Sequence, residues 1–240
     1  MVRKLRITLD NRDPVCYTAY TIRKLHSDDL KEALLAFQRD GLVPLALRDA
    51  LQIRLNIFSV GASKAEKRNW TENAIVTATA VAYRGEETKV VMPYAKPLVK
   101  VTPDTILDRL RMPLSEAEYN EIKPRPWQIF RNPRPLLEDM RTPLTPDAAA
   151  HNYAWRRAIG DEPLIRNYAG LFTKHQPGMA VDLMHLGTKE STLYPLVLGP
   201  VPRGSGLRDE RVGPSRHIII GAIPEILEGV EGLLNDKPRR

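Results

Sequence analysis

Arginines and glycines gather in the stretch PRGSGLRDERVGPSRHIIIG, residues 202–221. The candidate ligand contacts in it are Arg203, Gly204, Gly206, Arg208, Arg211 and Arg216. Glycine lets backbone N–H groups approach a ligand closely, and arginine presents a planar fork of donors that suits phosphate. The next regular element is expected to be a strand, Ile218–Ile220, where P-loop and dinucleotide motifs require a helix. The stretch predicts a loop that contacts a phosphate backbone; the alternative is a hairpin connection in which Asp209 and Glu210 partly neutralise the arginines.

A second group of cations comes earlier in the chain. Residues 61–69 are expected to form a flexible basic loop, with Lys64, Lys67 and Arg68 as candidate backbone contacts. Trp70 follows directly. An exposed aromatic beside cations can stack a base, but Trp70 is more simply explained as a core residue.

A third group lies in KPRPWQIFRNPRP, residues 123–135, where prolines prevent regular structure. Arg125, Trp127 and Arg131 are its candidate contacts. The segment predicts an arm along a nucleic-acid backbone, or a strap across the protein's own surface.

One residue is a candidate for catalysis. His26 lies beside Arg23 and Lys24 and would be the general base of a metal-independent ribonuclease if it met the arginine-rich loop in space. The five histidines are scattered singly, and Cys16 is the one cysteine, so neither a metal site nor a cofactor is expected.

Composition indicates a globular protein with an acidic partner. The 240 residues are 42% hydrophobic and 27% charged, and the formal net charge is +7. Such a basic balance favours nucleic acid. With one cysteine, no signal-like N-terminus and no long apolar run, the expected location is the cytoplasm, away from membranes.

The elements that must position these residues are predicted from periodicity. The patterns indicate a strand at 5–9, a helix at 29–40 ended by Gly41, a strand at 51–57, and a hairpin at 74–83 and 88–94. Late strands are expected at 179–186, 193–198 and 218–220. The predicted division is an N-terminal lobe (1–100), a proline-rich connecting segment (101–143) and a C-terminal lobe (144–240).

This order of elements is similar to an α+β, ferredoxin-like, RRM-type domain: an antiparallel sheet with flanking helices, here with an irregular proline-rich middle. It resembles the RAMP-type RNA-binding subunits of CRISPR effector complexes, which have a late glycine-rich loop and a turn like Leu186-Gly187-Thr188-Lys189-Glu190. The resemblance implies RNA binding through the arginines of residues 202–221, without catalysis.

We therefore expect a nucleic-acid-binding protein, with RNA as the partner, that works beside other protein subunits in a ribonucleoprotein assembly and in antiviral defence. The alternatives are a structural or assembly protein, such as a virion component, and a metal-independent ribonuclease.

Overall fold

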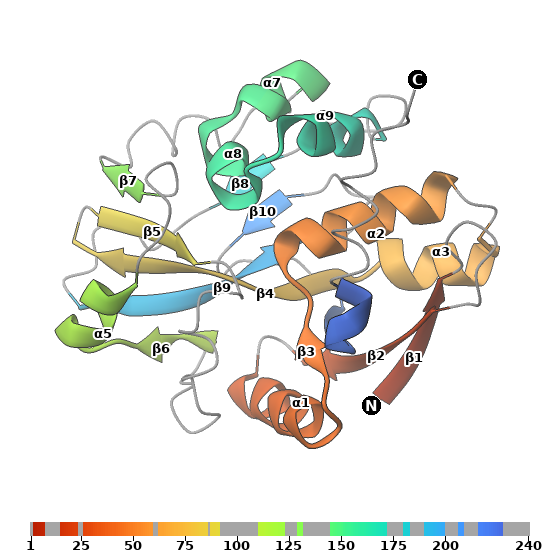
Figure 1. Ribbon diagram of the computed structural model, residues 1–240, viewed down its shortest axis with the longest axis horizontal. Coiled ribbons are helices and arrows are strands. Elements are labelled where there is room, and N and C mark those ends of the chain that lie inside the picture. Colours follow the sequence, from red (N-terminus) through yellow and green to blue (C-terminus); the bar gives the residue numbers. More distant parts are fainter. Residues whose placement is uncertain are drawn as a thin grey trace.

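The strands and helices of the computed structural model form one sheet with helices on both faces (Figure 1). The structure describes residues 2–7, 15–23, 26–59, 62–85, 87–91, 110–122, 129–131, 145–171, 180–182, 190–199, 206–208 and 216–227. The strands are β1 (Val2–Ile7), β2 (Val15–Ile22), β3 (Val43–Pro44), β4 (Ala74–Arg84), β5 (Glu87–Val91), β6 (Met112–Pro113), β7 (Ile129–Arg131), β8 (Ala180–Asp182), β9 (Thr192–Leu198), β10 (Gly206–Arg208) and β11 (His217–Ala222). The helices are α1 (Ser27–Arg39), α2 (Leu47–Ser59), α3 (Lys64–Thr71), α5 (Glu116–Glu121), α7 (Pro146–His151), α8 (Tyr153–Ile159) and α9 (Glu162–Gly170).

The sheet is mixed, and its main path runs β1-β2-β11-β4-β9-β10-β8. Its neighbours are antiparallel except for two parallel pairs, β11 with β4 and β10 with β8. The late strand β11 lies between the early strands β2 and β4, so both expected lobes contribute neighbouring strands to one sheet.

The ferredoxin-like, RRM-type prediction is wrong. That fold has a helix after its first strand, whereas here β1 pairs directly with β2, from Val2 opposite Tyr20 to Ile7 opposite Val15. Because β2 follows β1 as an antiparallel partner, the helix α1 comes one strand too late, and the strand order differs from a ferredoxin-like sheet.

Two apolar cores lie on the two faces of the sheet. Helices α2, α8 and α9 pack on one face, where Trp70 and Trp155 are fully buried. Helix α1 covers the other face through Leu30, Ala33 and Phe37, and Figure 1 shows it on the opposite side of the sheet from α2. Among the described residues, no helix is long and apolar enough to cross a membrane.

Helix α2 replaces the predicted strand at 51–57. Its buried positions include Leu47, Ala50, Leu51, Arg54 and Ile57, which recur at helical spacing. Arg54 lies inside this buried stripe. Because a charged residue is ordinarily assigned to the solvent face, the sequence did not show the helical period of the buried positions.

Several local predictions are confirmed. Strands β4 and β5 form the expected hairpin, with Gly85 at a φ of +58° in the turn. Helix α1 ends as expected before Gly41, which has a φ of +66°. Its start is different: Asp29, with Glu32 three residues later, predicts an N-cap at Asp29, whereas the observed N-cap is His26 and the Asp29 carboxylate accepts hydrogen bonds from Arg23.

A close approach between α1 and β11 yields a stability prediction at Gly221. A Cβ built on Gly221 would lie 2.6 Å from Cε1 of Phe37, a ring that is itself buried against Tyr20. Gly221→Ala is therefore expected to lower the free energy of unfolding by about 1–3 kcal/mol through overpacking. The measurement is a urea denaturation curve.

Gly170, at the end of α9, is the matched control, because a Cβ there would have no atom within 4 Å. Gly170→Ala is expected to leave stability unchanged or to raise it by up to about 1 kcal/mol, since alanine favours the helix. A Gly221→Ala protein as stable as the parent would contradict the close packing of β11 on α1.

Candidate anion-binding site

Helix α3 occupies the segment that was predicted to be a flexible basic loop, and that prediction is wrong. Ser63 is the N-cap: its Oγ accepts from the Glu66 N–H at 3.2 Å, and the Ser63 N–H donates to Oε2 of Glu66 at 2.9 Å. These bonds form a capping box. The Ser63 hydroxyl also donates to Oε2 of Glu66 at 2.7 Å, and this bond, together with the one from the Ser63 N–H, holds the pKa of Glu66 below its usual range. The Ser-x-x-Glu spacing was visible in the sequence and is the signal that identifies this helix.

A buried arginine holds the junction between α3 and β4. Arg54 of α2 is 0% exposed. Its Nε donates to the Trp70 carbonyl at 2.9 Å, and its Nη2 donates to the Asn73 carbonyl at 2.8 Å. Its Nη1 donates to the Gly199 carbonyl at 2.6 Å and to the Tyr168 hydroxyl at 2.9 Å. This network fixes the last turn of α3 relative to α9 and the end of β9.

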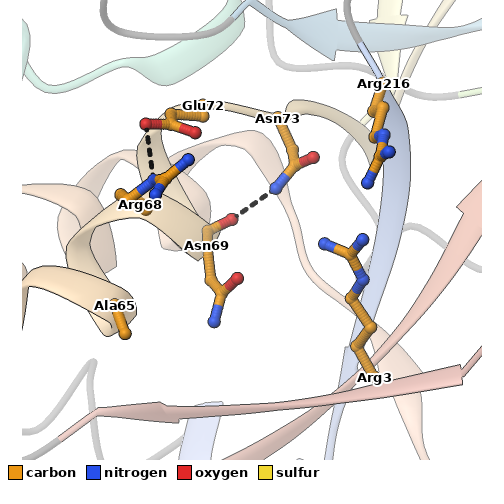
Figure 2. A pocket seen from close by; sticks show the side chains of 7 residues that line it. All are labelled: Arg3, Ala65, Arg68, Asn69, Glu72, Asn73 and Arg216. Atoms are coloured by element: carbon orange, nitrogen blue, oxygen red, sulfur yellow. Dashed lines mark hydrogen bonds and ion pairs between the residues drawn. The ribbon is translucent and has the colours of Figure 1, made fainter.

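Two arginines from opposite ends of the chain reach the side of this junction. Arg3 lies on β1, and Arg216 directly precedes β11, where its carbonyl accepts from the Ala74 N–H at 2.8 Å. The order β1-β2-β11-β4 brings them to the same part of the sheet. Figure 2 shows their guanidinium groups pointing toward one another.

Between them and α3 lies a cleft of about 430 Å³. Its polar lining residues are Arg3, Arg68, Asn69, Glu72, Asn73 and Arg216. Among the described residues that line it, three arginines against one glutamate leave a formal charge of +2. The side-chain amide of Asn73 donates to the Asn69 carbonyl at 2.7 Å, which keeps it in place at the edge of the cleft.

The three arginines are not equivalent. Arg68 Nε lies 3.0 Å from Glu72 Oε1 and forms an i,i+4 ion pair. Within the described part of the chain, neither Arg3 nor Arg216 has a carboxylate partner. Guanidinium groups stay charged at any physiological pH, so two that converge without a carboxylate favour an anion between them.

Arg23 shows the contrasting case. It follows Ile22, the residue of β2 that pairs with His217, but it forms a bidentate pair with Asp29, at 3.0 and 2.8 Å. Its hydrogen bonds lower the pKa of the Asp29 carboxyl to about 2. This neighbouring arginine is thus neutralised by Asp29, while the two in the cleft have no such carboxylate partner among the described residues.

The other predicted contacts are dispersed. Lys64 is exposed and Lys67 half-buried on α3, and neither lines the cleft. Gly206 and Arg208 belong to β10, and Arg131 belongs to β7. The remaining candidates lie outside the described residues: Arg203, Gly204, Arg211, Arg125 and Trp127.

Sequence reasoning named Arg68 and Arg216 but missed Arg3. The signal for Arg3 is its register on β1, two residues before the buried Leu5 and four before the buried Ile7, on the same face of the strand. A strand predicted to begin at Leu5 left this residue out.

His26, the candidate general base, lies outside the cleft. Its side chain is 61% exposed, and Nδ1 lies 3.6 Å from Oδ2 of Asp28. In the described ranges, no three His, Cys, Asp or Glu side chains are grouped so that they could hold a metal ion.

Comparison with known proteins identifies the fold alone. No protein-family model and no curated protein matches the sequence. A solved structure from work on the accommodation of massive sequence variation in Nanoarchaeota by the C-type lectin fold is similar to this chain, with a TM-score of 0.58 and 12% sequence identity. The match covers 89% of this chain and 99% of that one. The fold of this chain is therefore similar to the C-type lectin fold.

This finding overturns the expected resemblance to RAMP-type subunits of CRISPR complexes, and with it the antiviral-defence expectation. The likeness depended on an opening strand, a following helix and a late strand, which many α+β folds share. It also depended on a strand at 51–57, which is helix α2.

Proposed function

We propose that this chain binds the phosphate groups of a nucleic-acid strand through the cleft formed by Arg3, Arg68 and Arg216. The observation that carries the proposal is the convergence of Arg3 and Arg216 without a carboxylate partner among the described residues. Arginine forks bind phosphate oxygens in pairs, and phosphate contacts supply most of the affinity for nucleic acid. The net charge of +7 supports the same partner.

RNA is the first ligand to test. Asn69, Glu72 and Asn73 line the cleft beside the arginines and offer both donors and acceptors. A ribose 2′-hydroxyl can use both kinds of group, whereas deoxyribose lacks that hydroxyl. The presence of further protein subunits in the same assembly stays a prediction.

The test measures the binding of fluorescently labelled single-stranded RNA of about ten nucleotides by fluorescence anisotropy. The titration is repeated at salt concentrations from about 50 to 200 mM. DNA of the same sequence and the RNA duplex serve as comparison ligands. Three phosphate contacts predict that log Kobs falls against log salt concentration with a slope of roughly −2, since each contact on a single strand contributes about −0.7.

An absence of binding at the lowest salt concentration would refute the proposal and favour an assembly role. Binding that did not weaken with salt would refute it too, because contacts with phosphate release counterions.

A further inference from the structure

The charge in the cleft exceeds what one internal phosphate of a nucleic acid can balance. Within the described lining, three arginines and Glu72 leave a formal charge of +2, and the Arg68–Glu72 ion pair is neutral as a unit. The excess therefore resides on Arg3 and Arg216. An internal phosphodiester carries one negative charge, while a phosphomonoester carries roughly −1.5 to −2 charges at pH 7.

The number of non-bridging phosphate oxygens also favours a phosphomonoester. Each guanidinium fork can donate two parallel hydrogen bonds. A phosphodiester has two non-bridging oxygens and a phosphomonoester has three, so the terminal group satisfies two facing forks more fully. Arg3 and Arg216 point toward one another on the side of the cleft opposite α3 and suit a group held between them.

The cleft also has room and hydrogen-bonding groups for the nucleoside that is attached to the phosphate. Its volume of about 430 Å³ lies within the range of roughly 300–1,000 Å³ that is typical of small-molecule sites. Within the part of the chain that the structure describes, the side-chain amide of Asn69 makes no hydrogen bond. It is available to a sugar hydroxyl or a base edge.

We propose that this cleft binds a phosphomonoester, of the kind found at the phosphorylated end of a nucleic-acid strand. Arg3 and Arg216 bind the terminal phosphate, and Asn69 contacts the attached nucleoside. Arg68, held by Glu72, borders the site and contributes less. This inference rests on the proposed function and narrows it from any backbone phosphate to a terminal one.

The experiment uses three RNA strands of about ten nucleotides with one sequence. One carries a 5′-phosphate, one a 3′-phosphate, and one has hydroxyls at both ends. The full chain is titrated with each strand at fixed salt concentration. One phosphorylated strand is expected to bind about tenfold tighter than the hydroxyl-ended strand, and the strand that does so identifies the end that the cleft accepts. Inorganic phosphate is expected to compete with that strand alone.

Arg216→Gln is expected to remove most of this preference. Arg39→Gln is its matched control: it changes the net charge equally, but Arg39 is exposed on α1, is paired with Asp40 and does not line the cleft. It should keep the preference.

Equal affinity for all three strands would overturn the inference while the proposed function stood. No binding to any strand would overturn both. A preference that survived Arg216→Gln unchanged would place the terminal phosphate elsewhere and overturn the assignment to this cleft.

Discussion

Replacing Arg3 and Arg216 together by glutamine is expected to weaken binding of end-phosphorylated RNA by about 100-fold, or about tenfold for each arginine. Each substitution removes a charge-assisted contact worth about 1.5 kcal/mol, and 1.4 kcal/mol corresponds to a factor of ten. The slope of log Kobs against log salt concentration should become less negative by about 1.4, since two phosphate contacts are lost. Anisotropy titrations at several salt concentrations measure both quantities.

Stability should change little in this double variant. Neither guanidinium group has an ion-pair partner among the described residues, so the substitution breaks no such pair there. Arg68→Gln is an informative comparison, since Arg68 already shares its charge with Glu72, and its effect on affinity should be smaller. A double variant that bound with parental affinity would exclude the cleft as the binding site.

The largest effect on stability is expected at Arg54. Arg54→Met keeps the length of the side chain but leaves the carbonyls of Trp70, Asn73 and Gly199 without their donor. A buried acceptor that loses its partner costs about 1–3 kcal/mol, while removal of the buried charge offsets part of the sum. The expected net loss is about 3 kcal/mol, seen as a fall in Tm of roughly 10 °C.

Two variants sharpen this test. Arg54→Lys retains the charge but not the planar fork of donors. Its Tm should therefore lie between that of the parent and that of Arg54→Met. Arg39→Met, at an exposed position on α1, should stay within about 0.5 kcal/mol of the parent. If Arg54→Met were as stable as the parent, the hydrogen bonds of Arg54 would make no net contribution to the free energy of unfolding. If Arg54 positions α3, the methionine variant should also bind RNA more weakly at temperatures where it is fully folded.

Local patterns predicted the elements whose signals lie within a few residues. The β4–β5 hairpin follows from two apolar runs around Gly85, and the end of α1 follows from Gly41. The Ser-x-x-Glu spacing of Ser115 and Glu118 likewise predicts a capping box, and the structure confirms it at the start of α5. Each depends on backbone preferences or on hydrogen bonds between near neighbours, which the sequence displays directly.

Predictions from sequence were wrong where a charged residue is buried, or where nearby cations outweighed a capping box. Arg54 is a cation in the buried stripe of α2, and its partners among the described residues, Trp70, Asn73, Tyr168 and Gly199, make that position tolerable. The cations around Ser63 favoured a loop, although the Ser-x-x-Glu spacing of a capping box is present there. Thr145-Pro146-Asp147 and Gly160 predict one continuous helix between them, whereas the structure divides this stretch at Asn152 into α7 and α8.

The sequence by itself determined the positive charge of the chain, its clearest helices and hairpin, and two of the three cleft arginines, Arg68 and Arg216. Only the tertiary structure decided that Arg3 belongs with them. Strand β11 enters the sheet between β2 and β4, and that insertion brings Arg216 near a residue more than two hundred positions earlier. Hydrogen bonds between strands so far apart leave no local periodicity, so the meeting of Arg3 and Arg216 could not be read from the sequence around either residue.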